Sequence, residues 1–562
     1  MNILKKINFI LVLVIVIAIF LRFYQLGSIP AGFLNDEANA GYDAYSLLLT
    51  GKDQWNSFFP LNNFVGFGDF QPPLNRYSLL IPIFLFGLNE FAVRFISALA
   101  GVLSVVAAYF LVKKLVSQKA AYFSALLLAV MPWAIGLNRI GHESNLAILF
   151  LITALFFGFL QKSKSSLYYS VIFLSLSMYT YSAYILYAPL VLAVILYSNY
   201  TKGGYKLLLK PLILFLIIIS PIFFQKNSAS VRFSQVGLTT NINSIGLINV
   251  LNDERGQCLT TFNPVICKIT NNKGTLFTSQ FIKNYLSHFS PNFLYISGTS
   301  TQFSILPKRG LDYVFNFLPL ILGIAFLLKN TQQKKLSMLF LILFLLSPLP
   351  DSLTSDGNYT RSSMMIPFIA IITGLGYYYL FHFLRNNYNN LKYPSIALFI
   401  LLIFLSTISF YVGYSTYFKN NYSIYSQYGY KDLISNIKAN ETNFNRIYLT
   451  THLNDAKQYI FYLFYSRYDP FLYQQKKDVV YRTVTDGWIS VDRIEKIYFV
   501  QNPPTLKDLK SLPSSSTLIV SNPVDFPQDI KSEFNIKDKL GNIIFKAVRL
   551  SDLLEYIKAK SD

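Results

Sequence analysis

Two adjacent carboxylates, Asp36 and Glu37, stand in the segment FLNDEANAGYDAYSLLLTGKD, residues 33–53. This segment follows closely on an apolar stretch, residues 7–26, that is long enough to cross a membrane. Charges beside a bilayer are costly unless they are solvated, paired or used. Asp36 could accept a proton as a general base, and its alternative role is a helix N-cap. Glu37 could bind substrate hydroxyls or could favour a helix amino terminus by its charge.

Further polar side chains come in short segments between apolar stretches. They are Gln71 in GDFQPPL, Arg139, His142 and Glu143 in NRIGHESN, and Asp351, Tyr359 and Arg361 in PLPDSLTSDGNYTRS. An Arg fork can bond two phosphate oxygens at once, and the alternative for Arg139 and Arg361 is snorkelling to the interface. We expect Arg22 and Arg94 to snorkel. His142 could be a metal ligand or, as the alternative, a hydrogen-bonded cap residue.

The composition indicates a membrane protein. Of the 562 residues 53% are apolar and only 14% are charged, where a soluble protein carries about 25%, and the mean hydropathy is +0.39. Eleven apolar stretches recur, and in lipid they should be helices. They are residues 7–26, 91–112, 119–137, 145–161, 167–181, 184–198, 207–224, 313–328, 336–348, 363–384 and 394–414. The sequence therefore predicts an α-helical polytopic membrane protein of about eleven spans.

The charge distribution predicts the orientation of these spans. Alternate connections carry fifteen Lys and Arg residues and not one Asp or Glu, which by the positive-inside rule places them in the cytoplasm. The net charge of +21 therefore follows the topology, which argues against nucleic-acid binding. We interpret the first stretch as an uncleaved anchor. The apolar run between Arg76 and Glu90 is too short to span and is predicted to be interfacial or re-entrant.

Three extracytoplasmic regions follow from this topology: residues 27–90, residues 225–312 and everything after about 415. The second region holds Cys258 and Cys267. On the oxidising side of a membrane a disulfide between them is favoured, and the alternative is two free thiols.

The carboxy-terminal residues, 416–562, change character. RIYLT, KIYFV, STLIVS and NIIFKAVRL are typical of short strands, and KDLISNIKAN, AKQYIFYLFYSRY and TLKDLKSL of helices. Such alternation predicts a small α/β domain. It carries no phosphate loop, zinc pattern or nucleophile elbow, so we interpret it as a docking or acceptor-recognition module. The predicted domains are thus 1–415 in the membrane and 416–562 outside it.

Several segments resemble the polyprenyl-phosphate-sugar glycosyltransferases of the GT-C superfamily, near the protein mannosyltransferases (glycosyltransferase family 39) and the lipid A aminoarabinose transferase. They are NDEANAGYDAYSLLLTGKD, GDFQPPL, LNEFAVRFISALAGVLSV, LNRIGHESNLAILF, YTYSAYILYAPL, SPNFLYISG and PLPDSLTSDGNYTRSSMMIPFIAIITGLG. The resemblance covers roughly residues 1–415. It implies a plasma-membrane enzyme that transfers a sugar, with inversion, from a polyprenyl-phosphate donor to a protein, lipid or glycan acceptor on the extracytoplasmic face.

The resemblance also implies roles for single residues. Asp36 matches the family's base, Glu143 its second acidic position, and Arg361, with Tyr359 beside it, a position near the lipid phosphate. Gln71 stands where many relatives have a basic residue, so one phosphate contact is either missing or supplied by Arg76. No cofactor is expected to be required, although carboxylates with His142 could hold a divalent cation.

Two other classes of function remain open. A multi-span transporter or flippase of lipid-linked sugars also needs many helices with charges, but such proteins usually show inverted repeats and charges near the midplane. A non-catalytic receptor that uses the carboxy-terminal domain would be indifferent to the charge of Asp36.

Overall fold

The structure, a computed structural model, describes residues 8–160, 164–224, 237–238, 241–299, 306, 308–329, 334–421, 423–450, 457–483, 489–500 and 516–561. The chain divides into two compact units, each described by itself. The bundle unit contains Met1–Tyr24, Phe70–Leu74 and Ser97–Tyr411, and the sheet unit contains Gln25–Asp69, Asn75–Ile96 and Val412–Asp562. The predicted domain boundary near residue 415 stays a prediction.

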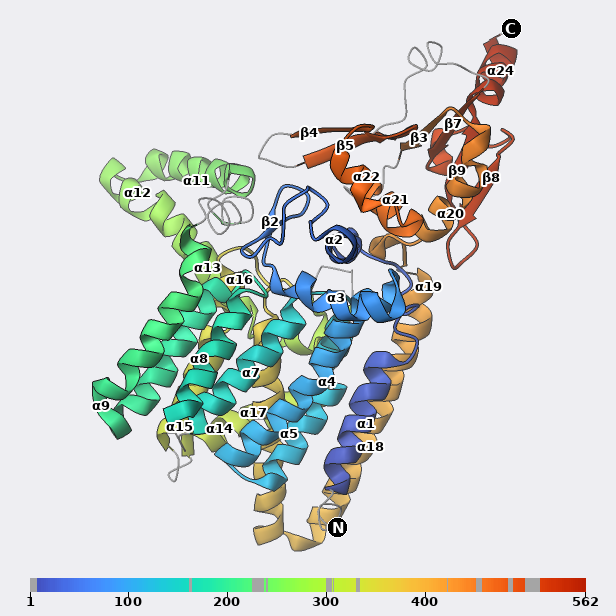
Figure 1. Cartoon of the computed structure of the whole chain (residues 1–562). Helices are drawn as coiled ribbons and strands as arrows, with labels where there is room; N and C mark the ends of the chain where they lie inside the picture. The colour runs from blue at the N-terminus through green and yellow to red at the C-terminus, as the bar shows by residue number, and fades with distance from the viewer. Residues whose placement is uncertain are drawn as a thin grey trace. The chain divides into compact units, whose positions relative to one another are not determined.

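Apolar helices build the bundle unit (Figure 1). They are α1 (Phe9–Phe23), α4 (Glu90–Leu115, which starts in the sheet unit), α5 (Gln118–Val130), α6 (Pro132–Asn138), α7 (Ser144–Leu160), α8 (Lys164–Met178), α9 (Tyr184–Phe224), α14 (Phe317–Lys329), α15 (Lys334–Leu346), α17 (Ile366–Asn387) and α18 (Asn389–Gly413). Every predicted apolar stretch contains such a helix. α5 and α6 share one stretch, and α9 covers two that meet at Gly204, which has φ 63°.

The number of membrane spans is a separate question from the number of helices. Among the described residues, four helices are long and apolar enough to cross a membrane, or five if the pair α5–α6, bent by 55°, counts as one span. Seven further apolar helices have 10–17 residues. The predicted count of eleven spans therefore stays a prediction, while the multi-pass architecture is confirmed.

Helix α17 is the centre of the bundle and α18 is at its margin. The apolar part of α17 is 83% buried, because α5 and α14 pack against it, whereas that of α18 is only 22% buried. Glycines allow α14 and α17 to approach closely, since a Cβ on Gly323 would collide with the Ile372 carbonyl and one on Gly376 with the Pro319 carbonyl. The exposed apolar face of α18 is what a lipid-facing helix requires.

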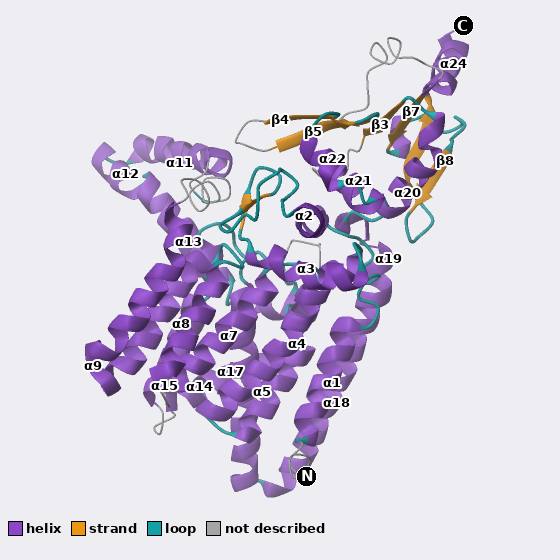
Figure 2. Cartoon of the chain, viewed as in Figure 1, coloured by secondary structure: helices purple, strands orange, loops and turns teal. Residues whose placement is uncertain are grey.

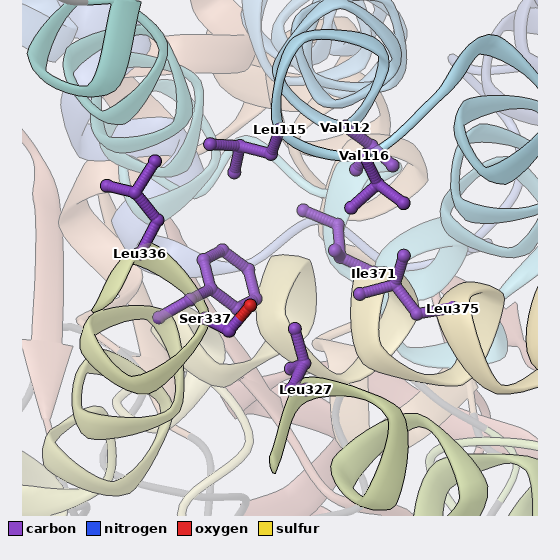
Figure 3. Close-up of a pocket in the computed structure, with 9 residues that line it drawn as sticks. Val112, Leu115, Val116, Leu327, Leu336, Ser337, Ile371 and Leu375 are labelled. Carbon is purple, nitrogen blue, oxygen red and sulfur yellow. The ribbon is translucent and has the colours of Figure 1, made fainter. Parts of the chain in front are cut away.

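Tight packing extends to the end of the bundle that carries the basic connections. Figure 3 shows side chains such as Leu115, Leu327 and Leu336 pointing into a common space between α4, α14, α15 and α17. This space measures about 20 Å³, which is room for about one water molecule. We assign it to packing.

The extracytoplasmic loop predicted at 225–312 contains helices in its described part. They are α11 (Asn241–Thr261), α12 (Pro264–Thr270), α13 (Lys273–Ser287) and the π-helix η2 (Asn292–Ile296). A disulfide joins Cys258 of α11 to Cys267 of α12. Shorter elements complete the unit: η3 (Val314–Asn316), α16 (Leu349–Ser352) and η4 (Ser363–Met365).

The sheet unit contains a mixed sheet of seven described strands in the order β4-β5-β6-β3-β7-β9-β8 (Figure 2). The strands are β3 (Arg446–Thr450), β4 (Val479–Thr483), β5 (Ile489–Ile494), β6 (Ile497–Val500), β7 (Thr517–Ser521), β8 (Phe534–Lys537) and β9 (Ile543–Arg549). β3 pairs in parallel with β6 and β7, and the other pairs are antiparallel. All four predicted strands are present, so the α/β prediction is confirmed.

The helices of this unit are α2 (Asn35–Thr50), α3 (Leu74–Phe86), α19 (Lys419–Asn421), α20 (Tyr430–Asn440), α21 (Gln458–Ser466), α22 (Pro470–Gln475) and α24 (Leu550–Ser561), and the short strands β1 (Phe64–Val65) and β2 (Phe70–Gln71) precede α3. The π-helix η5 (Tyr414–Phe418) and the 3-10 turns η6 (Ser423–Ser426), η7 (Glu441–Asn443) and η10 (Pro523–Asp525) connect them. The predicted helix TLKDLKSL lies outside the described residues. At 13 residues, α3 measures about 20 Å, less than a bilayer core of about 30 Å, and its Ile81, Phe84 and Leu85 are exposed.

Helix α2 is part of the core of the sheet unit. It packs against α21 and α22, and every residue from Glu37 to Ala44 is buried. At Gly41 a Cβ would come within 2.7 Å of the Phe464 and Val93 side chains, so only glycine allows α21 to lie this close. The helix that begins beside the carboxylate pair is thus held by the carboxy-terminal part of the chain.

Candidate active site

The start of α2 separates the roles of the two adjacent carboxylates. The helix begins at Asn35, and the Leu34 N–H donates to Glu37 Oε2 at 3.0 Å. Glu37, not Asp36, therefore satisfies the backbone at the helix start. Glu37 is 2% exposed, whereas Asp36 is exposed. Of the two adjacent carboxylate residues, Asp36 is therefore the one that lies at the surface.

Arg94 fixes Glu37 from the other side. Its Nε lies 2.8 Å from Glu37 Oε1 and its Nη2 3.2 Å from Oε2, and both side chains are buried. The same guanidinium donates to the carbonyls of Leu26, Pro30 and Gly32. The expectation that Arg94 snorkels is wrong, because three turn carbonyls and a buried carboxylate all need its donors. Its network fixes the chain that leads into α2.

Residues of the carboxy-terminal region hold both ends of α2. Gln427, in the left-handed region at φ 58°, accepts a hydrogen bond through Oε1 from the Asn35 N–H at 2.6 Å. At the other end Gln474 Nε2 donates to Ser46 Oγ, Thr50 Oγ1 and the Asp53 carbonyl at 2.9 Å each. Sequence reasoning missed both glutamines, because amides more than 390 residues away in the chain give no local signal.

Three further acidic or basic groups of the first loop are buried together. Arg76 donates to Asp43 at 2.8 Å and to Asn39 at 2.8 Å, and it is 2% exposed. Burial raises the pKa of Asp43, and the charge of Arg76 opposes this. Burial, and next the negative charge of Asp43, raise the pKa of Asp53 to about 6. Arg76 thus braces the loop through Asp43 and Asn39, and the alternative in which it supplies a donor-phosphate contact stays a prediction.

Arg139 and Arg22 also serve the structure of the bundle unit. Arg139, fully buried, donates to the carbonyls of Leu21 and Tyr24 at 2.8 and 2.7 Å, which lie in the last turn of α1 and at its C-cap. Arg22 is fully buried and donates to Asn138 Oδ1 at 2.8 Å. The expectation that Arg22 snorkels is wrong. Of the two alternatives for Arg139, phosphate binding and snorkelling, neither describes its contacts.

His142 and Glu143 lie at the start of α7. His142 Nδ1 accepts from the Ser144 N–H at 3.1 Å and lies 2.9 Å from Ser144 Oγ, so it matches the alternative of a hydrogen-bonded cap. Its ring meets the Tyr181 ring edge-on at 5.4 Å. Glu143 is half-buried. In the part of the chain that the structure describes, no three His, Cys, Asp or Glu residues gather as a metal site.

Arg361 lies at the end of a turn that is organised by Asp351. The buried carboxylate accepts from His288 Nε2 at 2.8 Å, from Ser355 Oγ at 2.6 Å and from the Asn358 N–H at 2.6 Å. Arg361 is half-buried and donates through Nη1 to Thr354 Oγ1 at 3.1 Å. The sequence pointed to the turn but missed His288, which stands 63 residues before Asp351.

Two of the predicted site segments meet within the bundle unit. η4, directly after Arg361, packs against α7, which directly follows Glu143. The Tyr359 carbonyl accepts from Trp133 Nε1 at 2.9 Å, which ties the same turn to α6. Gln71 is half-buried just before Leu74, whose N–H donates to the Tyr179 carbonyl at 3.0 Å. An Arg and an acid therefore lie at neighbouring helix starts in this unit.

Comparison with known proteins shows which family model and which solved structures this chain resembles. Residues 70–224 match the family model of the dolichyl-phosphate-mannose-protein mannosyltransferases, which includes Glu143 but begins after Asp36 and ends before Arg361. ArnT from Cupriavidus metallidurans, solved bound to undecaprenyl phosphate, has a TM-score of 0.52 at 13% identity, with 95% of this chain and 97% of that one covered. An oligosaccharyltransferase of Archaeoglobus fulgidus, solved with Zn and sulfate, has a TM-score of 0.51 at 12% identity, with 91% and 68% covered. The chain has a GT-C fold.

The predicted resemblance to GT-C glycosyltransferases is thereby confirmed for the fold. Among curated proteins none matches the chain by sequence. The GT-C likeness extends over the bundle and the sheet unit together, since ArnT is covered almost from end to end. The α/β part therefore belongs to the likeness, whereas the sequence resemblance stopped near residue 415.

Proposed function

We propose that the chain is a membrane glycosyltransferase that moves a sugar from a polyprenyl-phosphate donor to a protein, lipid or glycan acceptor. The observation that carries this function is the exposed Asp36 at a helix start that Glu37 and Arg94 hold rigid. A rigid frame around one accessible carboxylate is what general-base catalysis requires. The undecaprenyl phosphate of the ArnT structure supports the class of donor.

The proposed reaction is a single displacement. Asp36 takes the proton from an acceptor hydroxyl while that oxygen forms a bond to the anomeric carbon. The bond between this carbon and the phosphate oxygen breaks, and the electron pair leaves with the polyprenyl phosphate. The configuration at the anomeric carbon inverts. Arg361 is assigned to the phosphate, since its guanidinium can bond two oxygens of the departing dianion, and Glu143 and Tyr359 are assigned to the substrate site.

No divalent cation is required for these steps. The candidate ligands fit a cation poorly, because His142 Nδ1 already accepts the Ser144 N–H. Zn in the Archaeoglobus fulgidus structure makes a cation worth testing. Activity should survive a chelator, and a loss that Mg²⁺ or Mn²⁺ restores would overturn this part of the proposal.

The orientation is also proposed. The basic connections lie in the cytoplasm, and Asp36, Arg361 and the sheet unit lie outside it. Cysteines placed at residues 163 and 331 should be protected from an impermeant thiol reagent, and one at residue 530 should react. Labelling at 331 without labelling at 530 would invert the topology.

A genetic experiment tests the function itself. Mass spectrometry of cell-surface glycans and glycoproteins, with and without the gene, should reveal one missing sugar that the wild-type gene restores. The same gene with Asp36→Asn should be produced at the wild-type level and should fail to restore the sugar. Restoration by this variant would favour a transporter or receptor, which has no need of a base.

A further inference from the structure

A second cavity lies in the bundle unit, beside the carboxy-terminal part of α18. Its volume is about 480 Å³. Asp312 and Tyr295 line it together with Arg309, Val314, Leu405 and Ser409. The elements that enclose it include η2, η3 and α18, and of the residues just named only Tyr295 lies in a segment, SPNFLYISG, that carries the family resemblance.

The polar part of the cavity is a buried carboxyl group. Asp312 is 4% exposed, and its Oδ1 accepts from the Tyr313 N–H and from Asn316 Nδ2, each at 2.8 Å. Within the described residues its Oδ2 has no hydrogen-bond partner, and neither has the hydroxyl of the equally buried Tyr295. Buried polar atoms are nearly always satisfied, because leaving one bare is costly. Asp312 Oδ2 therefore calls for a donor that a bound molecule would supply.

The rim of the cavity is apolar and exposed. Leu405 is 54% and Val314 65% exposed, and both belong to the cavity wall. α18 exposes an apolar face along most of its length, so the rim continues into the surface that lipid covers. Leu405 lies eight residues before Gly413, about 12 Å from the end of the helix. The cavity therefore opens beside the carboxy-terminal half of α18 and not at the middle of this apolar helix.

The charges at the cavity complement a phospholipid headgroup. Arg309 is exposed and brings a cation to the same cavity that holds the Asp312 carboxyl group. A phosphate suits Arg309, and a hydroxyl or ammonium donor suits Asp312 Oδ2. We propose that this cavity binds a bilayer phospholipid whose headgroup carries a hydrogen-bond donor, with the phosphate on Arg309 and the donor on Asp312. This site is independent of the proposed glycosyl transfer and of its donor lipid.

Native mass spectrometry of the purified full-length chain tests this site. The two probes are dioleoyl phosphatidylethanolamine, whose ammonium donates, and dioleoyl phosphatidylcholine, whose headgroup has a phosphate but no donor. The wild-type chain should retain one phosphatidylethanolamine molecule about tenfold better than phosphatidylcholine, as expected for one charge-assisted bond. Asp312→Asn should abolish this preference, and Arg309→Gln should weaken retention of both lipids. The matched control Asp356→Asn changes an exposed acid of the same unit and should keep the preference.

Two results would overturn the lipid site. One is equal retention of the two lipids by the wild-type chain, and the other is an unchanged preference in Asp312→Asn. Displacement of the bound phosphatidylethanolamine by an equimolar polyprenyl-phosphate sugar would also overturn it, because the occupant would then be the glycosyl donor. If Asp312→Asn fails to fold, Tyr295→Phe replaces it. Removing the buried Tyr295 hydroxyl, the second polar group of the cavity without a partner among the described residues, should reduce the preference and leave the charge of Asp312 unchanged.

Discussion

The start of α2 and the turn at residues 351–361 are built in the same way, but the charge that each presents has the opposite sign. In each, a buried pair fixes the backbone: Glu37 with Arg94 in the first and Asp351 with His288 in the second. Each then presents a more accessible charged neighbour, which is Asp36 at the helix start and Arg361 at the turn. The two acidic residues Asp36 and Glu37, which look alike in sequence, thus have different positions, because Glu37 is buried and braces the backbone whereas Asp36 is exposed.

The difference between the two regions lies in the bracing partner. Arg94 carries its charge at any ordinary pH, and it also binds three carbonyls of the approaching chain. His288 directly follows α13 in the long loop at residues 225–312, and its Nδ1 lies 2.6 Å from the Asn284 carbonyl while its Nε2 faces Asp351. Both ring nitrogens thus lie within hydrogen-bond distance of an acceptor oxygen. We call the pair Glu37–Arg94 the first frame and the pair Asp351–His288 the second frame. The first frame is therefore local to the sheet unit, and the second depends on how the long loop folds.

Removing the cation of the first frame should have the largest effect. Arg94→Ala leaves Glu37 and three carbonyls buried without their donor, and such losses cost about 3–5 kcal/mol. A thermal unfolding midpoint lowered by many degrees is expected. The matched control is Lys431→Ala, which breaks the pair with Glu90 by removing its exposed partner and should cost at most about 1 kcal/mol. Equal midpoints for the two variants would show that the first frame is not built on Arg94.

Asp53 is a buried carboxyl that, unlike Glu37 and Asp351, is held within the described residues by backbone N–H groups alone. Its pH dependence therefore provides a second test of how buried carboxyl groups stabilise the first loop. Its pKa is about 6 in the folded chain, above the ordinary value of 3.8. The folded state therefore binds the proton more tightly, and stability is lost as pH rises from about 4 through 6, by up to about 3 kcal/mol. Asp53→Asn keeps the acceptor oxygen and should remove this loss.

The measurement for Asp53 is the unfolding midpoint at pH 5 and pH 7.5. The wild-type midpoint should fall between the two values more than that of Asp53→Asn. Asp356→Asn, an exposed acid, should keep the wild-type difference. If the midpoint of Asp53→Asn fell between the two pH values as much as that of the wild type, the pH dependence would belong to other groups.

The second frame should respond less than the first when its bracing side chain is removed. His288→Ala leaves Asp351 without one of its several hydrogen-bond donors, which should cost about 1–3 kcal/mol of stability. It should also raise the concentration of the sugar donor that is needed for half-maximal transfer, because Arg361 loses its fixed position. His288→Gln can still donate one hydrogen bond and should recover part of both losses. His382, an exposed histidine, provides the control His382→Ala. A donor requirement unchanged in His288→Ala would separate this pair from Arg361.

Arg361→Lys should give the smallest effect. A point charge replaces a two-pronged contact, so the apparent donor requirement should rise about tenfold, which equals about 1.4 kcal/mol. The unfolding midpoint should not change, since the side chain is only half-buried. Arg385→Lys, an exchange at an exposed arginine, serves as control. Identical donor requirements would remove Arg361 from the phosphate site.

The helices and strands were predictable from the sequence, but the buried ion pairs and hydrogen bonds that hold them together were not. Apolar runs and short alternating strands are local patterns, so the helices of the bundle and the strands RIYLT and STLIVS were predictable. Arg22 and Arg94 were expected to snorkel because their sequence neighbours are apolar, but each finds its acceptors in distant segments. Glu37 lies 57 residues from Arg94, and no local period encodes such a pair. Buried ion pairs depend on tertiary proximity, which periodicity does not report.

The most direct test compares Asp36→Asn with Glu37→Gln in one transfer assay. The assay measures the rate of sugar transfer from a polyprenyl-phosphate sugar in detergent, per folded molecule, together with the unfolding midpoint. If Asp36 is the base and Glu37 the brace, Asp36→Asn lowers the rate by about 10²–10⁴-fold and leaves the midpoint nearly unchanged, whereas Glu37→Gln lowers the midpoint more than the rate. An Asp36→Asn protein that folds and transfers sugar at the wild-type rate would contradict the account.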